Sequence, residues 1–247
     1  MLRPVSVITV TNGGYFFVRL LVEKVREFIG DRKYEIIAVD LGSKDGTSAW
    51  LKQQPDVRVI RKRQWFTSQH RHGENAEEAV RAAKYEYIAL LDSDAFPIQP
   101  DWLNLTVDKL DDENRLAGAQ FDGKHKGNPY GWYIHPHFMT FCKSDLEKLI
   151  ILRKVRGHDT DTGEEATIRV LDAGLKIIKY PLELCSRFVV GHPRVPTVSA
   201  GVFHAWYVTR LIKEKSTVDQ ETGGAVTREN YQYPLQDLLR KAYSLDY

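Results

Sequence analysis

The sequence has no apolar run that approaches the ~20 residues needed to cross a bilayer as a helix. The first apolar stretch, Val5 to Val10, is too short for a signal peptide, and the polar pair Thr11 and Asn12 follows it at once. Cysteine is scarce as well, because the chain contains only Cys142 and Cys185 and no CxxC spacing. We therefore expect a cytoplasmic protein with reduced thiols, and a disulfide between the two cysteines is the less favoured alternative.

A surplus of either charge is also missing. The 35 Lys and Arg residues face 33 Asp and Glu residues, which leaves a formal net charge of +2. Near neutrality removes the main compositional argument for a nucleic-acid partner, since such proteins present a basic face or stripe. Glycine (17) and proline (10) are too few for a collagen-like or low-complexity chain. The 247 residues therefore indicate a globular protein that can bury a sizeable core.

The first hundred residues alternate strand and helix patterns. Apolar and β-branched runs predict strands at 5–10, 35–39, 57–60 and 85–91, and apolar residues at helical spacing predict helices at 15–29, from 47, and around 75–83. The continuous apolar run from Ile88 to Leu91 is typical of a strand buried in the middle of a parallel sheet. Repeated strand–helix–strand units predict an α/β fold with a doubly wound, mainly parallel sheet.

The second half of the chain is less regular. Strands are predicted at 116–121, 138–142 and 176–180, and helices are predicted to open at Pro100, Ser144 and Thr162. An aromatic, histidine-rich loop is expected between the first two of these strands. No linker-like change in composition and no internal repeat divides the chain, so we expect one domain with a nucleotide-binding-type half and a more variable half.

Asp92-Ser93-Asp94 is the most informative motif in the sequence. Its two carboxylates directly follow a buried strand, at the position where open α/β sheets bind their ligands. Carboxylate oxygens suit Mg²⁺ and Mn²⁺, which keep some of their waters and bind substrate phosphates as well. The alternative is an ordinary solvated turn, because Asp and Ser favour turns.

A second acidic residue, Asp40, also follows a strand, and the segment Gly42-Ser43-Lys44-Asp45-Gly46-Thr47 comes after it. In a parallel sheet Asp40 lies at the same edge as Asp92, where a carboxylate can accept hydrogen bonds from a base or a ribose. The glycines permit close approach and a positive φ. From this segment alone, an ordinary turn followed by a helix is the favoured interpretation.

Four motifs together resemble the family 2 glycosyltransferases. They run from Ser6 to Thr11, Glu35 to Thr47, His72 to Ala76 and Tyr87 to Asp94, in the order and spacing of that family. The resemblance is close over about the first 105 residues and loose beyond them. It implies the GT-A fold, a nucleotide-sugar donor and a divalent metal, Mn²⁺ or Mg²⁺. Two departures are that the first strand ends in Thr11-Asn12-Gly13, and that Asp40-Leu41-Gly42-Ser43 replaces the common Asp-Asp-Gly-Ser.

The resemblance also implies roles for individual residues. The expected contacts to the nucleotide sugar are Thr11, Asp40, Gly42, Ser43, His72, Asp92, Ser93 and Arg210. The expected metal ligands are Asp92 and Asp94, with Asp94 the favoured direct ligand. His204 resembles a late histidine that some GT-A enzymes add as a ligand to the metal or the diphosphate, and an ordinary packed histidine is the alternative.

The family carries its catalytic base just before a helix in the second half, and the segment 157–165 resembles that site. It has Asp-Thr-Gly where relatives commonly have Glu-Asp. Asp161 is the favoured base, Asp159 the second choice and Glu164 the third. The alternative is that these carboxylates only stabilise the N-terminus of a helix through its dipole.

Weaker candidates lie between these motifs. His135 and His137 are candidates to line the acceptor side, although Pro136 is expected to bend the chain and turn them partly apart. Three aromatic residues are candidates to stack on a sugar face: Trp102, Trp132 and Tyr133. Large aromatic residues more often belong to the core, which is the favoured interpretation for these three.

These observations predict one GT-A-like domain over 1–247, with a nucleotide-sugar-binding half at 1–105, an acceptor-binding and catalytic half at 106–232, and an amphipathic tail at 233–247. The expected activity is that of a metal-dependent, inverting hexosyl- or deoxyhexosyltransferase. Its expected acceptor is a hydroxyl of a glycan or of a lipid-linked molecule, as in polysaccharide biosynthesis. The alternatives are a sugar-nucleotide-binding relative without acceptor chemistry, and a haloacid-dehalogenase-like phosphatase, which expects its acidic motif on the first strand.

The tail carries apolar residues on one helical stripe, namely Leu235, Leu238, Leu239, Ala242 and Tyr243. Arg240 and Lys241 lie beside this stripe. Docking of the tail on the body, or on a second subunit of a homodimer, is the favoured interpretation. The alternative is peripheral contact with a membrane that carries a lipid-linked acceptor, which would place the protein at the inner face of that membrane.

Overall fold

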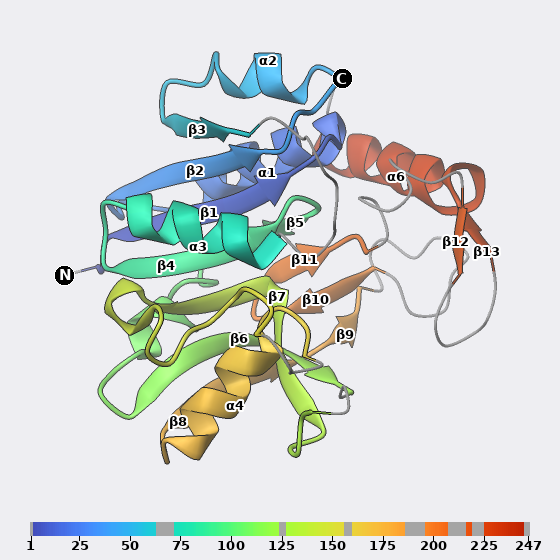
Figure 1. Ribbon diagram of the computed structural model, residues 1–247. Helices are drawn as coiled ribbons and strands as arrows, with labels where there is room; N and C mark the ends of the chain where they lie inside the picture. Colours follow the sequence, from blue (N-terminus) through green and yellow to red (C-terminus); the bar gives the residue numbers. More distant parts are fainter. Residues whose placement is uncertain are drawn as a thin grey trace.

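The computed structural model describes residues 2–62, 72–123, 127–155, 160–185, 196–206, 216–218 and 225–244. At its centre is a seven-stranded sheet in the order β3-β2-β1-β4-β7-β6-β8 (Figure 1). Its strands are β1 (Val5–Thr11), β2 (Tyr34–Asp40), β3 (Val57–Arg61), β4 (Tyr87–Asp92), β6 (Asn114–Asp122), β7 (Trp132–Cys142) and β8 (Lys176–Pro181). Strand β7 is antiparallel to both of its neighbours, and all other neighbouring strands are parallel.

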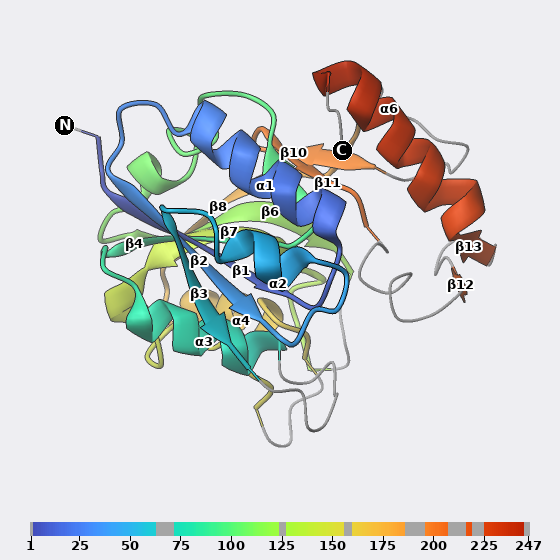
Figure 2. The same cartoon turned by 90° about the horizontal axis from the view of Figure 1, so that it is seen from above.

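Helices cover both faces of this sheet (Figure 2). One face carries α1 (Tyr15–Phe28) and α2 (Thr47–Leu51), and the other carries α3 (His72–Ala82) and α4 (Glu164–Asp172). Alternate residues of a strand point to opposite faces, so β1 contributes Val5 and Val7 to the apolar cluster around α1 and Ile8 and Val10 to the cluster around α3. The predicted doubly wound, mainly parallel sheet is thereby confirmed.

A four-stranded sheet, in the order β5-β11-β10-β9, lies beside the main one. Its strands are β5 (Ala95–Pro97), β9 (Glu183–Leu184), β10 (Thr197–Ser199) and β11 (Val202–His204). A separate pair consists of β12 (Ser216–Val218) and β13 (Ala225–Thr227). Strand β5 begins three residues after β4 ends, and β11 pairs with it in the register His204 to Ala95. The smaller sheet therefore brings position 204 to the end of β4.

Two helices predicted in the second half, opening at Pro100 and Ser144, are absent. These segments form turns and two short 3₁₀ helices, η2 (Val107–Lys109) and η3 (Lys143–Asp145). At Ser144 a tertiary contact overrides the local capping pattern, because the guanidinium of Arg115 on β6 binds both carboxylate oxygens of Asp145, at 2.9 and 2.7 Å. Sequence patterns report local preference, and contacts of this kind can outweigh it.

The histidine-rich segment expected as a loop is the first half of β7. Proline is tolerated within this strand because its pairing with β4 begins only at Phe138, opposite Leu91. Pro136 therefore lies beyond the end of β4, and toward β6 it falls within the register shift between the Met139–Gly118 and Ile134–Gln120 pairs. Proline is found in sheets where no ladder bond needs its missing N–H. The extension carries β7 past the point where β4 ends.

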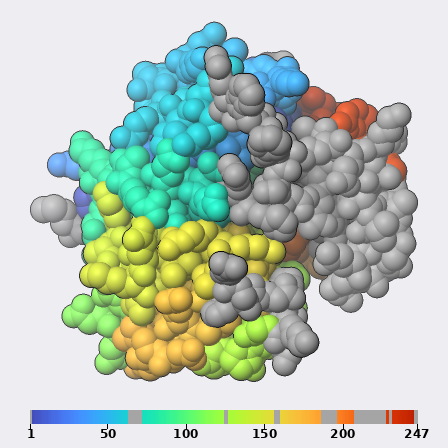
Figure 3. Space-filling model, in the orientation of Figure 1, coloured from blue at the N-terminus to red at the C-terminus, as the bar shows by residue number. Residues whose placement is uncertain are grey.

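Helix α3 packs directly on the segment that follows β7. A Cβ on Gly73 would lie 1.7 Å from the carbonyl oxygen of Leu152, so the contact requires glycine. One turn later, the buried Glu77 carboxylate accepts the backbone N–H groups of Leu152 (3.0 Å) and Arg153 (3.1 Å) and the Arg153 guanidinium (2.6 Å). In Figure 3 the teal surface of α3 runs straight into the yellow surface of this segment. The contact ties the two halves of the chain together beside the first turn of α3.

The tail forms α6 (Tyr233–Tyr243), which lies beside α1 (Figures 1 and 2). Leu235 and Leu239 are fully buried in the cluster around α1. The Arg240 guanidinium lies over the ring of Phe16, 5.0 Å from its centre. Docking of the tail on the body is confirmed, and within the described part of the chain no helix combines the length and apolarity needed to cross a membrane.

We predict that Glu77→Ala lowers the free energy of unfolding by about 3 kcal/mol or more, because it leaves two backbone N–H groups and an arginine without their buried acceptor. Denaturant unfolding followed by circular dichroism measures this loss. The matched control is Glu78→Ala on the same helix, which removes only a partly exposed pair with Lys62 and should cost about 1 kcal/mol or less. Equal losses in the two variants would contradict the anchoring role of Glu77.

Candidate active site

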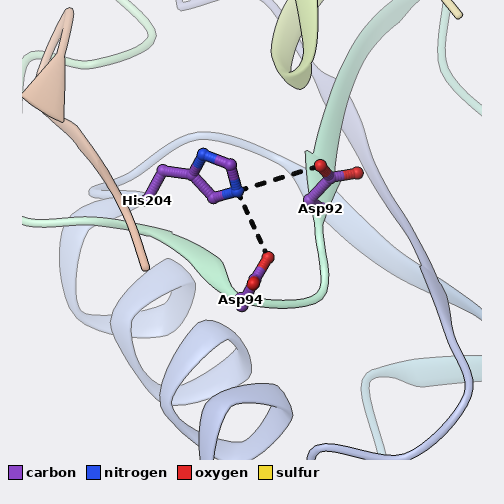
Figure 4. Close-up of side chains that lie close together, drawn as sticks. All are labelled: Asp92, Asp94 and His204. Carbon is purple, nitrogen blue, oxygen red and sulfur yellow. Dashed lines mark ion pairs between the residues drawn. The ribbon is translucent and has the colours of Figure 1, made fainter. Parts of the chain in front are cut away.

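Three side chains that could hold a metal ion meet where β4 ends (Figure 4). Asp92 is the last residue of β4, Asp94 lies in the turn before β5, and His204 is the last residue of β11. His204 Nε2 is 3.4 Å from Asp94 Oδ1 and 3.9 Å from Asp92 Oδ2, and one ligand atom of each residue lies within 4.8 Å of the others. The structure thus brings together the three residues that were predicted as metal ligands.

Backbone pairing fixes this triad. The register of β5 and β11 sets His204 opposite Ala95, and the backbone N–H of Ala205 donates to the carbonyl oxygen of Asp94 at 3.0 Å. Asp94 and His204 are buried, whereas Asp92 keeps part of its surface exposed. The three side chains are therefore held by strand pairing on both sides, and their mutual geometry does not depend on a freely moving loop.

Negative charge gathers at this point. Burial raises the pKa of the Asp92 carboxyl, His72 and His204 oppose that rise, and the charges of Asp94 and Asp161 add to it. Within the described residues, the ion-pair partners of Asp92 and Asp94 are histidines alone, including His72 at 3.5 Å from Asp92. No lysine or arginine of the described chain neutralises the two carboxylates, so a divalent cation would supply the missing positive charge.

The donor set fits such a cation. Two carboxylates suit Mg²⁺ and Mn²⁺, and an imidazole nitrogen is a ligand that the transition ion accepts more readily. In the described structure, the other ring nitrogen of His204, Nδ1, is buried without a hydrogen-bond partner, and Nε2 faces both carboxylates (Figure 4). Three protein ligands leave coordination positions for water or for phosphate oxygens.

A second polar group lies at the end of β2. Asp40 is fully buried, and its Oδ1 accepts the backbone N–H of Ser43 at 2.9 Å. The other oxygen, Oδ2, is buried with no hydrogen-bond partner among the described residues. Gly42 adopts a φ of 87°, which lets the chain turn there, and the hydroxyl of Ser43 accepts the N–H of Gly13 at 2.6 Å. An unpaired buried acceptor is costly, so a ligand that donates to Asp40 would relieve that cost.

Strand β1 separates this group from the triad. It pairs Thr11 with Asp40 on one side and Val10 with Asp92 on the other. The two acidic residues are therefore two strands apart along one edge of the sheet, a distance on the order of 10 Å. Thr11 is buried, and its hydroxyl donates to the carbonyl oxygen of Gly13 at 2.7 Å, so it supports the loop after β1.

A third group lies on the other side of the triad, at the start of α4. The exposed Asp161 accepts the backbone N–H of Thr162 through Oδ1 at 2.8 Å, and it also accepts a hydrogen bond from the hydroxyl of Tyr133. Burial raises the pKa of Tyr133, and the charges of Asp161 and Glu164 raise it further, so the phenol stays a neutral donor. Asp161 thus sits within electrostatic reach of Asp92 with its carboxylate oriented by two donors.

Glu164 has a different role from Asp161. It is fully buried, its Oε1 accepts the side-chain amide of Asn128 at 2.8 Å, and its Oε2 accepts the backbone N–H of Asp161 at 2.9 Å. Both carboxylate oxygens are therefore engaged in holding the start of α4. The other two predicted site residues in this part of the chain, Asp159 and Arg210, lie outside the described residues.

The structure places beside the triad residues that the sequence did not single out as its neighbours. The ring of His137 is fully buried and stacks on His204 with a centroid separation of 4.3 Å and an angle of 7°. His135 and His137 are not turned apart, because their Nδ1 atoms lie 2.8 Å from each other, although the register of β7 against β6 does shift around Pro136. The sequence did contain a signal for this contact between the two rings, because residues two apart on an extended strand point the same way.

The three aromatic residues considered as sugar-stacking candidates are packed against other groups of the protein. Trp102 is fully buried in the core, and its indole N–H donates to the carbonyl oxygen of Phe28 at 3.2 Å. Tyr133 is buried, with its hydroxyl next to Asp161. The ammonium of Lys179 lies over the ring of Trp132, 4.1 Å from its centre. Trp206 lies beside His204 instead, with a centroid separation of 4.4 Å. It stands two residues after that histidine in the sequence.

The sequence matches the family profile described as glycosyl transferase family 2 over residues 6–165, well over half of the chain. The protein therefore belongs to glycosyl transferase family 2. A comparison with curated protein sequences finds no match.

Solved structures agree with this assignment at the level of the fold. The mannosyltransferase PcManGT from Pyrobaculum calidifontis, in complex with GDP-Man and Mn²⁺, is 21% identical, with a TM-score of 0.57 over 73% of this chain and 56% of that chain. Glucosyl-3-phosphoglycerate synthase from Mycobacterium tuberculosis, in complex with phosphoglyceric acid, is 16% identical, with a TM-score of 0.52 over 72% of this chain and 70% of that chain. The aligned part thus spans little more than half of the mannosyltransferase. Both are GT-A glycosyltransferases, and this protein has their fold.

We predict that His204→Ala weakens Mn²⁺ binding at least ~10-fold, because the variant lacks one of the three proposed protein ligands. Electron paramagnetic resonance of free Mn²⁺, in the presence of a nucleoside diphosphate, measures this affinity. Asp237→Ala is the matched control, since this exposed carboxylate on α6 pairs only with Arg240 in the described structure. Unchanged Mn²⁺ affinity in His204→Ala would contradict the ligand set.

Proposed function

We propose that this protein is a metal-dependent, inverting glycosyltransferase that moves a sugar from a nucleotide diphosphate donor to a hydroxyl of a glycan or lipid-linked acceptor. The observation that carries the proposal is the order of three groups along one sheet edge. The Asp92, Asp94 and His204 triad lies between the buried Asp40 at the end of β2 and the exposed Asp161 before α4. A donor, its metal and an acceptor hydroxyl need sites in that order.

On the donor side, Asp40 would bind the nucleoside through its unpartnered oxygen, and Thr11, Gly42 and Ser43 would shape the loops around it. His72, whose Nε2 is 3.5 Å from Asp92, and Ser93 would lie beside the diphosphate. Arg210 is proposed as a further phosphate contact because it follows His204 closely in the sequence and a guanidinium can donate two hydrogen bonds to a phosphate. The mannosyltransferase contains GDP-Man and Mn²⁺, which supports a donor of this class here.

The proposed metal is Mn²⁺ or Mg²⁺, held by Asp92, Asp94 and His204. A bound divalent cation offsets the negative charge that develops on a departing diphosphate. Asp92 and Asp94 would otherwise repel that diphosphate, so their carboxylates can face it only with the cation between them. The proposal therefore requires the triad to bind metal and donor together.

On the acceptor side, Asp161 is the proposed base. Its carboxylate is exposed, held by Thr162 and Tyr133, and close enough to Asp92 for their charges to interact. Glu164 is a poorer base because it is fully buried and both of its oxygens are engaged. A base across the triad from Asp40 can take a proton from a hydroxyl that attacks the sugar opposite the departing diphosphate. Attack from that face inverts the configuration.

Two alternatives are less well supported. A haloacid-dehalogenase-like phosphatase would carry its acidic motif after the first strand, whereas here it follows β4. A binding protein without acceptor chemistry would have no need of an exposed carboxylate oriented by two donors at the site. Membrane contact or dimer formation through the tail has little support, because Leu235 and Leu239, in the middle of its apolar stripe, are buried against the body.

We predict that Asp161→Asn lowers the turnover number by ~10²–10⁴-fold and leaves donor affinity nearly unchanged, since only the proton acceptor is removed. Steady-state kinetics of transfer, with donor affinity from calorimetry, separates the two effects. Asp172→Asn on the last turn of α4 is the control, because it pairs with Tyr130 away from the triad. Full transfer activity in Asp161→Asn would overturn the base assignment.

The donor class is tested with Asp94→Ala. Wild-type protein with Mn²⁺ should be stabilised in a thermal-shift assay by some of GDP-mannose, UDP-glucose and dTDP-rhamnose, because a ligand that binds only the folded state raises its stability. Asp94→Ala should lose this stabilisation and all donor turnover. Absence of a shift with every nucleotide sugar, or an equal shift in the variant, would contradict the proposed function.

A further inference from the structure

Three partly exposed rings form a group beside the metal triad, which we call the aromatic wall. It consists of Phe121 on β6, His135 on β7 and Trp206 after β11. Their ring centres are 5.5 Å apart for Phe121 and His135, 5.1 Å for His135 and Trp206, and 5.9 Å for Phe121 and Trp206. Trp206 also packs on His204 at 4.4 Å, so the wall begins at a proposed metal ligand.

The sheet topology places the wall on the acceptor side of the triad. In the strand order, β7 and β6 follow β4 on the side away from β1 and β2. Because β7 is antiparallel to β4 and pairs Phe138 with Leu91, His135, which comes three residues before Phe138, lies beyond the end of β4. Phe121 pairs with Tyr133, whose hydroxyl binds Asp161. The wall and the proposed base therefore share the side opposite Asp40.

Trp206 is held in an uncommon conformation. Its φ is 52°, in the left-handed region that a bulky side chain rarely adopts. The indole N–H donates to the hydroxyl of Thr197 at 2.8 Å, which fixes the ring and uses its polar edge. Strain of this kind persists only where surrounding contacts maintain it, and it gathers at functional sites. What Trp206 can offer a ligand is therefore the apolar face of a fixed ring.

The charge around the wall selects the kind of ligand. Asp92, Asp94 and Asp161 lie on this side of the molecule, and their mutual repulsion is already felt at Asp92. These carboxylates would repel an anionic acceptor, whereas they would not repel a neutral one. One face of a pyranose ring is lined by C–H groups, which complement the electron-rich face of an aromatic ring. Its hydroxyls can at the same time reach a carboxylate such as Asp161.

We infer that the aromatic wall of Phe121, His135 and Trp206 binds a neutral pyranose ring of the acceptor, so that the acceptor is a carbohydrate and not a small phosphorylated acid. This inference rests on the proposed function and names the acceptor class for the same site. The wall orients the ring so that one hydroxyl lies toward Asp161. Glucosyl-3-phosphoglycerate synthase, by contrast, is a neighbour whose structure contains phosphoglyceric acid.

The test is saturation-transfer NMR on the full chain with Mg²⁺ and a nucleoside diphosphate, GDP, UDP or dTDP in turn. The probes are the methyl glycosides of glucose, mannose, galactose and rhamnose, with 3-phosphoglycerate as the anionic comparison. We expect at least one glycoside to receive saturation on the C–H groups of one ring face, and 3-phosphoglycerate to bind more weakly. Phe121→Ala should weaken that glycoside's binding roughly tenfold, the loss of one stacking contact, and Phe121→Tyr should restore it.

Phe121 is the chosen position because it does not touch His204, and Trp206→Phe gives a second variant that keeps a ring beside the metal ligand. Tyr233→Ala, an exposed aromatic on α6, is the control and should leave glycoside binding at the wild-type level. Three results would overturn the acceptor class alone. They are equal glycoside binding by Phe121→Ala and wild type, tighter binding of 3-phosphoglycerate than of any glycoside, and no glycoside binding while Mg²⁺ and nucleotide still bind. Failure of the nucleotide and metal to bind wild-type protein would instead overturn the proposed function.

Discussion

The pairing of β11 with β5 is the contact on which the site depends. It sets His204 opposite Ala95, immediately after Asp94, and thereby adds an imidazole to a pair of carboxylates that a single strand end provides. Trp206 follows the same strand, β11, and packs beside His204. The hydroxyl of Thr197 on β10 holds the Trp206 ring by accepting its indole N–H. Both the proposed metal ligand set and the first ring of the aromatic wall follow from this one pairing.

The second constraint is the accumulation of negative charge in a partly buried place. Asp92 and Asp94 have only histidines as ion-pair partners among the described residues, and burial raises the pKa of Asp92. Buried carboxylates without a positively charged partner destabilise a fold unless a cation binds between them. A nearly neutral chain, with a formal net charge of +2, therefore still contains a local cluster of negative charge, which we propose binds a divalent metal and, through it, a diphosphate.

Much of the first half was predictable because its signals are local. Strand and helix periodicity placed Asp40 and Asp92 at one edge of a parallel sheet, and the registers of β1 confirm that they flank it. His204 was found only through resemblance, since its pairing with β5 joins distant parts of the chain. The role of β7 was missed because Pro136 indicates a loop, whereas the structure uses it where pairing with β4 has ended. The helix expected at Ser144 failed because Arg115 binds Asp145.

A crystal structure with Mn²⁺ and a nucleoside diphosphate, with anomalous diffraction data for manganese, would show directly where the metal binds. We expect one strong anomalous peak within about 2.5 Å of oxygens of Asp92 and Asp94 and of His204 Nε2. We also expect the diphosphate to bind that ion and the nucleoside to lie at Asp40. Manganese at another place, or a diphosphate bound without contact to this triad, would contradict the proposed site.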